Sequence, residues 1–254
     1  MPRPPQSRPG VPAELAPVLE YLGAIGYGDL YRGRPAAVVP AESAGSGEPS
    51  IERIAGREGG EGGGGGDARE ERLAALAAQV ASCRLCGLCE GRNRTVFGSG
   101  NPRAELMFIG EGPGAEEDRQ GLPFVGRAGE LLTRIVQAIE TTRDDVYIAN
   151  IVKCRPPGNR DPQPGEVAAC RPYLEEQIAL VRPRVIVALG RIAAQTLLGN
   201  DTPIGRLRGR WFTVQGVPTM VTYHPAALLR NPALKRPTWE DMQAVRDRLR
   251  GTTA

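Results

Sequence analysis

The chain is poor in histidine and in aromatic residues: His224 is its one histidine, and 5% of its 254 residues are Phe, Trp or Tyr. A single imidazole excludes every metal site built from several histidines. No apolar run is long enough to span a membrane, and the N-terminus lacks the apolar stretch of a secretory signal. We therefore expect a cytoplasmic protein whose thiols stay reduced.

The common nucleotide-binding motifs are also missing. The glycine-rich loop GEGPGAEEDRQGLPFVG (110–126) has no Gly-Lys-Ser or Gly-Lys-Thr and no GxGxxG spacing. Its glycines form a tight turn into a helix, or they let a flat ligand approach the backbone. Phe124 in this loop either stacks on such a ligand or belongs to the core.

Composition divides the chain in two. Residues 1–67 are rich in Pro, Gly and Ala, and 59–66 read GGEGGGGG. We predict a low-complexity, largely disordered extension there and one folded domain over 68–254. The extension holds 6 Lys+Arg against 9 Asp+Glu, whereas the rest holds 26 against 20. A positive domain fits a polyanionic partner.

Short apolar runs alternate with helical patterns in the second part, which predicts an α/β fold with a parallel sheet covered on both faces. The four predicted strands are 105–110, 146–151, 184–189 and 218–223, and the predicted helices are 127–141, 163–181, 191–198 and 238–250.

Three polar or glycine-rich features follow the ends of these strands: Glu111-Gly112, Asn150 and His224. Ligands of open α/β sheets bind beyond the carboxyl ends of the strands, so we expect these features at one pocket. The Asn150 amide suits the N3–H and O4 edge of uracil, although it could simply cap a turn. His224 could donate a hydrogen bond to an oxyanion or be structural.

Five cysteines form a pattern typical of a metal site. Cys83 and Cys86 make a Cys-x-x-Cys pair with Cys89 nearby, and Cys154 and Cys170 follow. Four thiolates from two separated segments suit zinc or a four-iron cluster. Buried free thiols and a disulfide remain alternatives.

The segment HPAALLRNP (224–232) places two leucines and an arginine on a predicted surface loop. Exposed apolar residues can act as a wedge between stacked bases, unless the leucines turn inward. Basic residues flank the segment and are candidates for phosphate contacts: Arg206, Arg208, Arg210, Lys235 and Arg236.

Together, GEGPGAEED, GLPFVG, NIVKCRPPGNRDP, HPAALLRNP and the cysteine spacing resemble the family 4 uracil-DNA glycosylases over about residues 75–250. The resemblance implies a three-layer α/β/α sandwich with a central four-stranded parallel sheet and a [4Fe-4S] cluster. It also implies release of uracil from single- or double-stranded DNA, leaving an abasic site, by a protein that we expect to be a monomer.

The resemblance assigns roles to individual residues. Phe124 stacks on the flipped uracil, Asn150 reads its polar edge, and His224 stabilises charge on uracil O2. Gly110 and Gly112 bind substrate. Gly112 stands where family 1 enzymes carry a water-orienting aspartate, so either Glu111 substitutes or water needs little activation. The implied cluster ligands are Cys83, Cys86, Cys154 and Cys170, and the implied DNA contacts are Leu228, as a wedge, and Arg230.

Two other functions are compatible with parts of the pattern. A uracil-capturing relative, family X, bonds covalently to the sugar through a second histidine, which this chain lacks. A non-catalytic, metal-stabilised nucleic-acid-binding module would explain the basic domain and the cysteines. It would not explain why Glu111, Phe124, Asn150 and His224 occur together.

Overall fold

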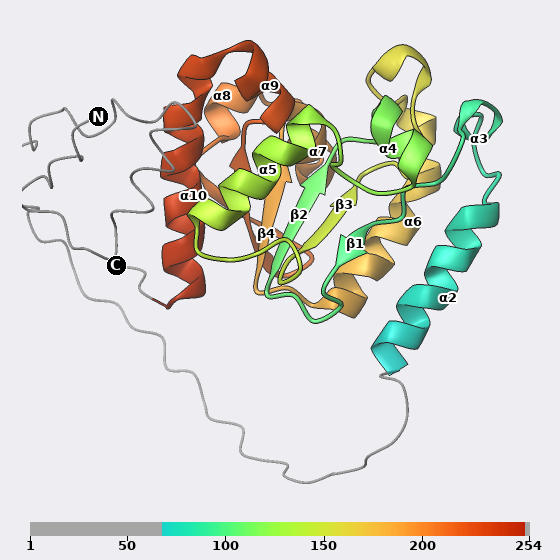
Figure 1. Ribbon diagram of the computed structural model, residues 1–254, viewed down its shortest axis with the longest axis horizontal. Helices are drawn as coiled ribbons and strands as arrows, with labels where there is room; N and C mark the ends of the chain where they lie inside the picture. Colours follow the sequence, from blue (N-terminus) through green and yellow to red (C-terminus); the bar gives the residue numbers. More distant parts are fainter. Residues whose placement is uncertain (1–67, 252–254) are drawn as a thin grey trace, which may run out of the picture.

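The structure, a computed structural model, describes residues 68–251. The predicted extension over 1–67 lies outside these residues. In the described part, helices cover both faces of one central sheet (Figure 1), as predicted for a three-layer sandwich. No helix between residues 68 and 251 combines the length and the apolarity needed to cross a bilayer.

The sheet is larger than predicted, with six strands in the order β1-β3-β2-β4-β6-β5. Its four central strands are parallel and lie within one residue of the predicted runs: β3 (Tyr147–Asn150), β2 (Leu106–Gly110), β4 (Val185–Leu189) and β6 (Val217–Thr222). The prediction missed two antiparallel edge strands, β1 (Ser99–Gly100) and β5 (Trp211–Val214).

The two edge strands differ in how visible they are in the sequence. Strand β1 consists of only two residues, one of them Gly100 with a φ of +121°. Because the strand is so short, no apolar run marks it in the sequence. Strand β5 forms a hairpin with β6 through Gln215 and Gly216, whose φ values are 49° and 79°. Two residues with positive φ form the tight turn that matches strand twist. The Gln-Gly pair after WFTV could therefore have indicated this hairpin in the sequence.

Alternate residues of each central strand face opposite layers, so the sheet separates two hydrophobic cores. Met107 and Ile109 of β2 belong to one core, Leu106 and Phe108 to the other. The first core lies under α2 (Ala68–Ser82), α6 (Pro164–Val181) and α7 (Arg191–Leu198). The second lies under α5 (Arg127–Ala138), α9 (Pro225–Arg230) and α10 (Lys235–Leu249).

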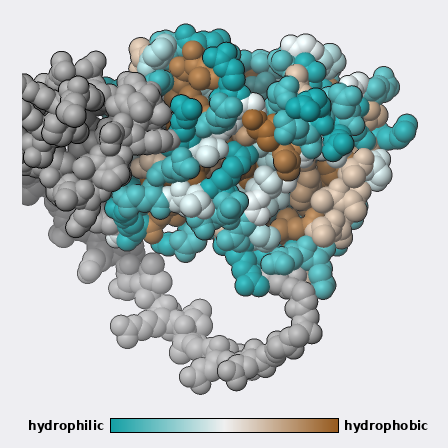
Figure 2. All heavy atoms as spheres, in the orientation of Figure 1, coloured by the Kyte–Doolittle hydropathy of each residue, from teal (hydrophilic) through white to brown (hydrophobic). Residues whose placement is uncertain are grey.

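Short helices cluster where the parallel strands end. They are α3 (Leu88–Gly91), α4 (Ala115–Gln120), α8 (Ile204–Leu207) and the 3₁₀ turns Pro157–Asn159 and Pro232–Leu234. In Figure 1 the short helices α3, α4, α8 and α9 lie toward the upper end of the molecule. Figure 2 shows a largely hydrophilic surface with an apolar patch at the end that carries α9. This end holds the candidate site.

Candidate active site

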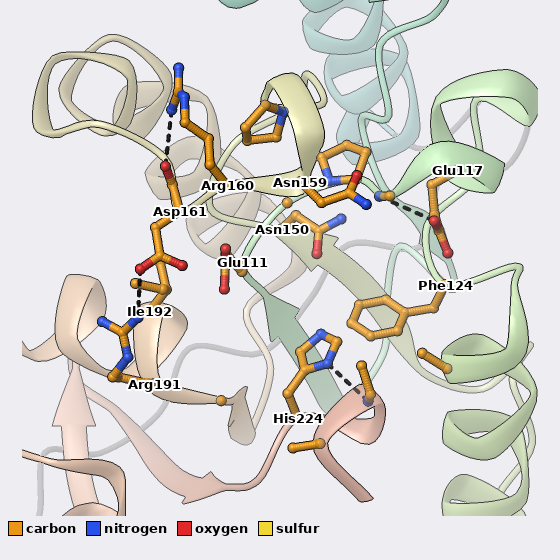
Figure 3. A pocket seen from close by; sticks show the side chains of 18 of the residues that line it. Glu111, Glu117, Phe124, Asn150, Asn159, Arg160, Asp161, Arg191, Ile192 and His224 are labelled. Carbon is orange, nitrogen blue, oxygen red and sulfur yellow. Dashed lines mark hydrogen bonds and ion pairs between the residues drawn. The ribbon is translucent and has the colours of Figure 1, made fainter. Parts of the chain in front are cut away.

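The carboxyl ends of β2, β3 and β6 open into one pocket of about 520 Å³ (Figure 3). Glu111, Asn150 and His224 all line it, so the structure brings together the residues that the sequence placed at one edge. Phe124 lines it too and also belongs to the hydrophobic core, with 6% of its surface exposed. Five further charged residues line the pocket: Glu117, Asp161, Arg160, Arg191 and Arg230. The pocket is therefore polar at its rim and aromatic within.

Asn150 is the last residue of β3, and its side chain is almost fully buried, with 1% exposed. Its Oδ1 has no hydrogen-bond partner among the described residues. Gly110 on the neighbouring strand β2 makes room for it, because a Cβ there would lie 2.4 Å from Asn150 Oδ1 and 2.6 Å from Phe124 Cζ. A buried acceptor without a partner is costly, so this oxygen is prepared for a donor from outside the protein.

His224 is the N-cap of α9, and its ring points into the pocket in Figure 3. Its Nδ1 accepts a hydrogen bond from the Ala226 N–H at 3.1 Å, which leaves the proton of the neutral ring on Nε2. Burial, followed by the nearby Arg230 guanidinium, lowers the pKa of His224 to about 4, against a smaller opposite effect of Glu117. The imidazole is therefore neutral at physiological pH and presents one N–H donor.

Phe124 has a backbone φ of 53°, in the left-handed region that is strained for a side chain of this size. One carboxylate holds this loop: Glu117 Oε1 accepts from the Val125 N–H at 3.0 Å and the Gly126 N–H at 3.3 Å, while Oε2 accepts from the Gly114 N–H at 3.1 Å. The Phe124 ring lies 5.5 Å from the His224 ring between centroids, tilted by 30°. The two rings are therefore in contact with each other, and both line the pocket.

Glu111 follows β2 directly and is partly buried in the pocket wall. Burial raises its pKa to about 7, the negative charge of Asp161 adds to the rise, and Arg191 opposes it. Asp161 in turn forms an ion pair with Arg191 at 2.5 Å. Glu111 therefore changes charge near neutral pH, as a general base or a water-orienting carboxylate requires. At Gly112 a Cβ would lie 2.8 Å from Val152 Cγ2, so glycine keeps this wall close to the backbone.

The structure corrects one predicted DNA contact. Leu228 is fully buried in the core beneath α9, whereas its neighbour Leu229 is 41% exposed. Successive helical residues are rotated by about 100°, so only one of the two leucines can face the core. Arg230 lines the pocket, and its predicted contact with DNA stays a prediction.

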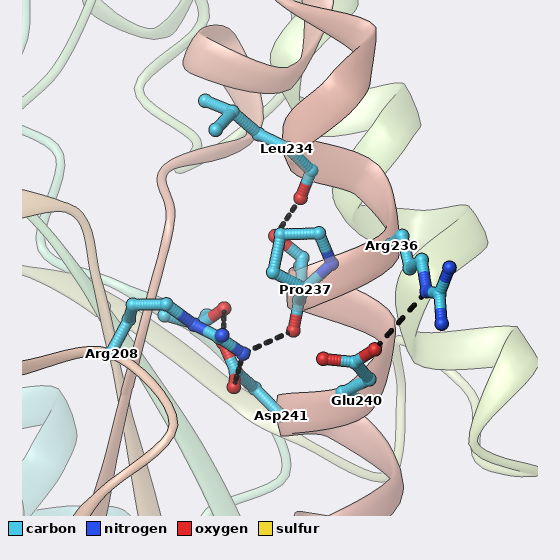
Figure 4. Close-up of polar contacts among 8 residues, drawn as sticks. Arg208, Leu234, Arg236, Pro237, Glu240 and Asp241 are labelled. Atoms are coloured by element: carbon cyan, nitrogen blue, oxygen red, sulfur yellow. Dashed lines mark hydrogen bonds and ion pairs between the residues drawn. The ribbon is translucent and has the colours of Figure 1, made fainter. Parts of the chain in front are cut away.

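The structure also removes one candidate phosphate contact. Arg208 donates to both carboxylate oxygens of Asp241 and to the carbonyl of Pro237 at 2.6 Å (Figure 4). Asp241 is 2% exposed and also accepts from the Thr222 hydroxyl at 2.6 Å. Arg208 therefore stabilises the junction between β6 and α10 instead of facing a ligand.

The five cysteines are all free thiols, so none of them forms the disulfide that the sequence left open. They line one small cavity between the α2–α3 connection, the end of β3 and α6: Cys83, Cys86, Cys89, Cys154 and Cys170. Arg92 Nη1 donates to Cys154 Sγ at 3.2 Å, and burial raises the pKa of the Cys154 thiol. Within residues 68–251 no group of three or more His, Cys, Asp or Glu side chains is arranged to hold a metal ion.

Several pocket residues were not singled out from the sequence. Glu117 lies within GEGPGAEED, and Asn159, Arg160 and Asp161 lie within NIVKCRPPGNRDP, but the motifs give these four residues no individual role. Arg191 begins α7 and had no motif. The usable signal was a polar, Pro- and Gly-rich stretch directly after a buried strand. Its individual contacts depend on loop conformation.

Comparison with known proteins matches residues 97–243 to the uracil DNA glycosylase superfamily. A type-4 uracil-DNA glycosylase of Saccharolobus solfataricus is 47% identical over 62% of this chain and 77% of its own length. Type-4 enzymes of Archaeoglobus fulgidus and Thermotoga maritima are 46% and 45% identical, over 59% and 61% of this chain and 79% and 83% of their own lengths. The chain therefore belongs to the uracil-DNA glycosylase superfamily, and within it to the type-4 uracil-DNA glycosylases.

Proposed function

We propose that this protein removes uracil from DNA by hydrolysing the N-glycosidic bond, leaving an abasic site in an intact backbone. One observation carries the proposal: the buried Asn150 oxygen, which has no hydrogen-bond partner within residues 68–251, lies in the same pocket as a neutral histidine and Phe124. Its relatives are named for this activity.

Asn150 recognises the base. Its Oδ1 accepts from uracil N3–H, and its amide nitrogen donates to O4. Cytosine has an unprotonated N3, so it would leave the buried oxygen without a donor. A site built to hydrogen-bond one edge rejects an analogue lacking the matching group, because its own polar atoms stay unpaired.

His224 stabilises the leaving group, and Phe124 holds the ring. Bond cleavage leaves negative charge on uracil O2, toward which the Nε2–H donates. A neutral N–H donor suits this role because the uracil ring gains its negative charge only in the transition state. One preorganised donor contributes about 3–4 kcal/mol, so the Asn150 contacts and substrate positioning must share the work.

Glu111 supplies the carboxylate that family 1 enzymes place one residue later. Above pH 7 its ionised form orients the attacking water and offsets the positive charge developing on the sugar. The alternative, in which water needs no such help, makes activity independent of this carboxyl.

The substrate is uracil-containing DNA, single- or double-stranded, bound by a monomeric cytoplasmic enzyme. Flipping a base from a duplex costs about a few kcal/mol. The exposed Leu229 takes the wedge role expected of Leu228, and Arg230 beside it contacts the phosphate backbone.

The cysteine cavity carries the donor set of a [4Fe-4S] cluster, which Cys83, Cys86, Cys154 and Cys170 would hold. Its lining includes all five cysteines, which are soft sulfur donors, and none of them forms a disulfide. When bound, the cluster supplies a structural cross-link between the α2–α3 connection, β3 and α6.

Incubation with end-labelled oligonucleotides tests the function. We expect free uracil and alkali-labile sites from U·G, U·A and single-stranded substrates, and none from the matched cytosine strand. Binding without alkali-labile sites, by protein with its full iron content, would instead support a non-catalytic module. A denaturation-resistant protein–DNA adduct would indicate covalent capture.

A further inference from the structure

Lys153 is a lysine with no exposed surface, lying between the candidate metal site and the substrate pocket. Its Nζ donates to the carbonyl oxygen of Asn150 at 2.9 Å and to Gln177 Oε1 at 2.5 Å. Gln177 is equally buried and donates onward to the Phe97 carbonyl at 2.9 Å and the Tyr147 hydroxyl at 3.2 Å. Lys153 thus anchors the end of strand β3 from behind the pocket.

The same residue contacts the cysteine cavity through its backbone. Its N–H donates to Cys170 Sγ at 3.3 Å, its chain neighbour is Cys154, and both cysteines line the cavity with it. Its carbonyl accepts from the Val96 N–H at 2.8 Å. One residue therefore connects two predicted cluster ligands with the backbone of the uracil-reading asparagine.

The charge of Lys153 is unusual for such a place. Its side-chain hydrogen-bond partners are a carbonyl and an amide, and among residues 68–251 no carboxylate forms an ion pair with it. Burying a cation is costly unless hydrogen bonds and an opposite charge offset the loss of hydration. The Cys170 sulfur accepts from the Lys153 backbone N–H, so a thiolate of a bound cluster would lie beside this residue and supply negative charge near it.

We propose that Lys153 is a positioning residue that offsets the charge of the cluster thiolates and transmits the placement of the cluster to Asn150. The inference rests on the proposed function and on the proposed cluster. It makes the cluster more than a distant cross-link, because the carbonyl that Lys153 holds belongs to the residue that reads uracil. Loss of the lysine should affect both iron retention and turnover.

The test compares wild type with Lys153→Met, which keeps the length of the side chain without its charge, and with Lys153→Arg, which keeps the charge but changes the shape. Arg184→Met, at the opposite end of the sheet, is the matched control for loss of one basic charge. Three quantities are measured on each full-length protein. They are the iron content, the rate at which a chelator bleaches the visible absorbance, and the steady-state kcat and KM on uracil-containing DNA.

We expect Lys153→Met to lose iron about tenfold faster and its iron-loaded fraction to show about a tenfold lower kcat with little change in KM, as for residues behind metal ligands. Lys153→Arg should keep iron near the wild-type rate but still lose kcat. If Lys153→Met does not fold, Lys153→Arg tests the charge argument by itself. Rapid iron loss from this variant, which keeps the positive charge, would refute the argument. Wild-type iron retention and kcat in Lys153→Met would overturn the proposal.

The proposed function can fail separately. Wild-type protein that retains iron but makes no abasic sites contradicts the glycosylase assignment, while the bleaching rates still decide the role of Lys153. Wild-type protein that never binds iron overturns the proposal for Lys153 directly.

Discussion

Asn150→Ala should abolish most activity while leaving the free energy of unfolding almost unchanged. The Asn150 side chain is 1% exposed, and its Oδ1 has no partner in the described structure. An unpaired buried oxygen costs about 1–3 kcal/mol, which the substitution removes. The lost packing of a short side chain beside an existing pocket acts in the opposite direction and is of similar size. We expect a net change of about 1 kcal/mol or less.

The effect on catalysis should be large, because both hydrogen bonds to the uracil edge disappear. Loss of one preorganised contact typically lowers the rate about 10²–10³-fold, and we expect kcat/KM to fall by at least that factor. Single-turnover release of uracil, scored as alkali-labile sites, measures the catalytic effect. Urea denaturation of the same preparations measures the free energy of unfolding.

Thr238→Val is the matched control, since Thr238 is also buried but its hydroxyl donates to the Leu234 carbonyl at 2.9 Å in α10, away from the pocket. It should lose about 1 kcal/mol of stability and keep its activity. The reasoning about Asn150 is refuted if its alanine variant unfolds more easily by over about 3 kcal/mol while kcat/KM stays within about threefold of wild type.

Three further substitutions test other parts of the site. Glu111 has a pKa of about 7 and acts when ionised, so kcat/KM should rise as pH increases through about 7, and Glu111→Gln should flatten this rise in a pH–rate profile. An unchanged profile would show that water needs no carboxylate. Gly110→Ala would push a Cβ into Asn150 Oδ1 and lower stability by about 1–3 kcal/mol along with uracil affinity. Gly165→Ala, whose added Cβ has nothing within 4 Å, should lower neither quantity. Thermal melting measures the stability of both variants, and equilibrium binding measures their affinity for uracil. Arg208→Met leaves Asp241 buried and unpaired, which should cost about 3–5 kcal/mol in denaturant titrations without changing the salt dependence of DNA binding. A weaker salt dependence would restore Arg208 as a phosphate contact.

Much of the fold could be read from the order of short apolar runs and helical patterns. Strands that are buried on both faces are mostly apolar, so β2, β3, β4 and β6 were visible within one residue. The meeting of Glu111, Asn150 and His224 also followed, because parallel strands end at one edge. Strand β1 could not be found, since two residues carry no periodicity.

Other features required the three-dimensional packing. The neutral state of His224 depends on burial and on Arg230, and the pKa of Glu111 on burial and on Asp161. No spacing of residues in the sequence encodes such surroundings. The loop conformation of Phe124 likewise depends on the Glu117 carboxylate, which contacts N–H groups on both sides of α4.

The amino-acid sequence by itself determined the fold class, the edge of the sheet that carries the site and the residue types gathered there, because these depend on periodicity and on the topology of parallel strands. Tertiary structure alone decided that Leu229 rather than Leu228 faces outward, that Arg208 is occupied by Asp241, and that Lys153 lies buried behind Asn150. The first outcome depends on the rotation of helix α9 about its axis. The other two depend on which side chains from distant segments are buried against one another.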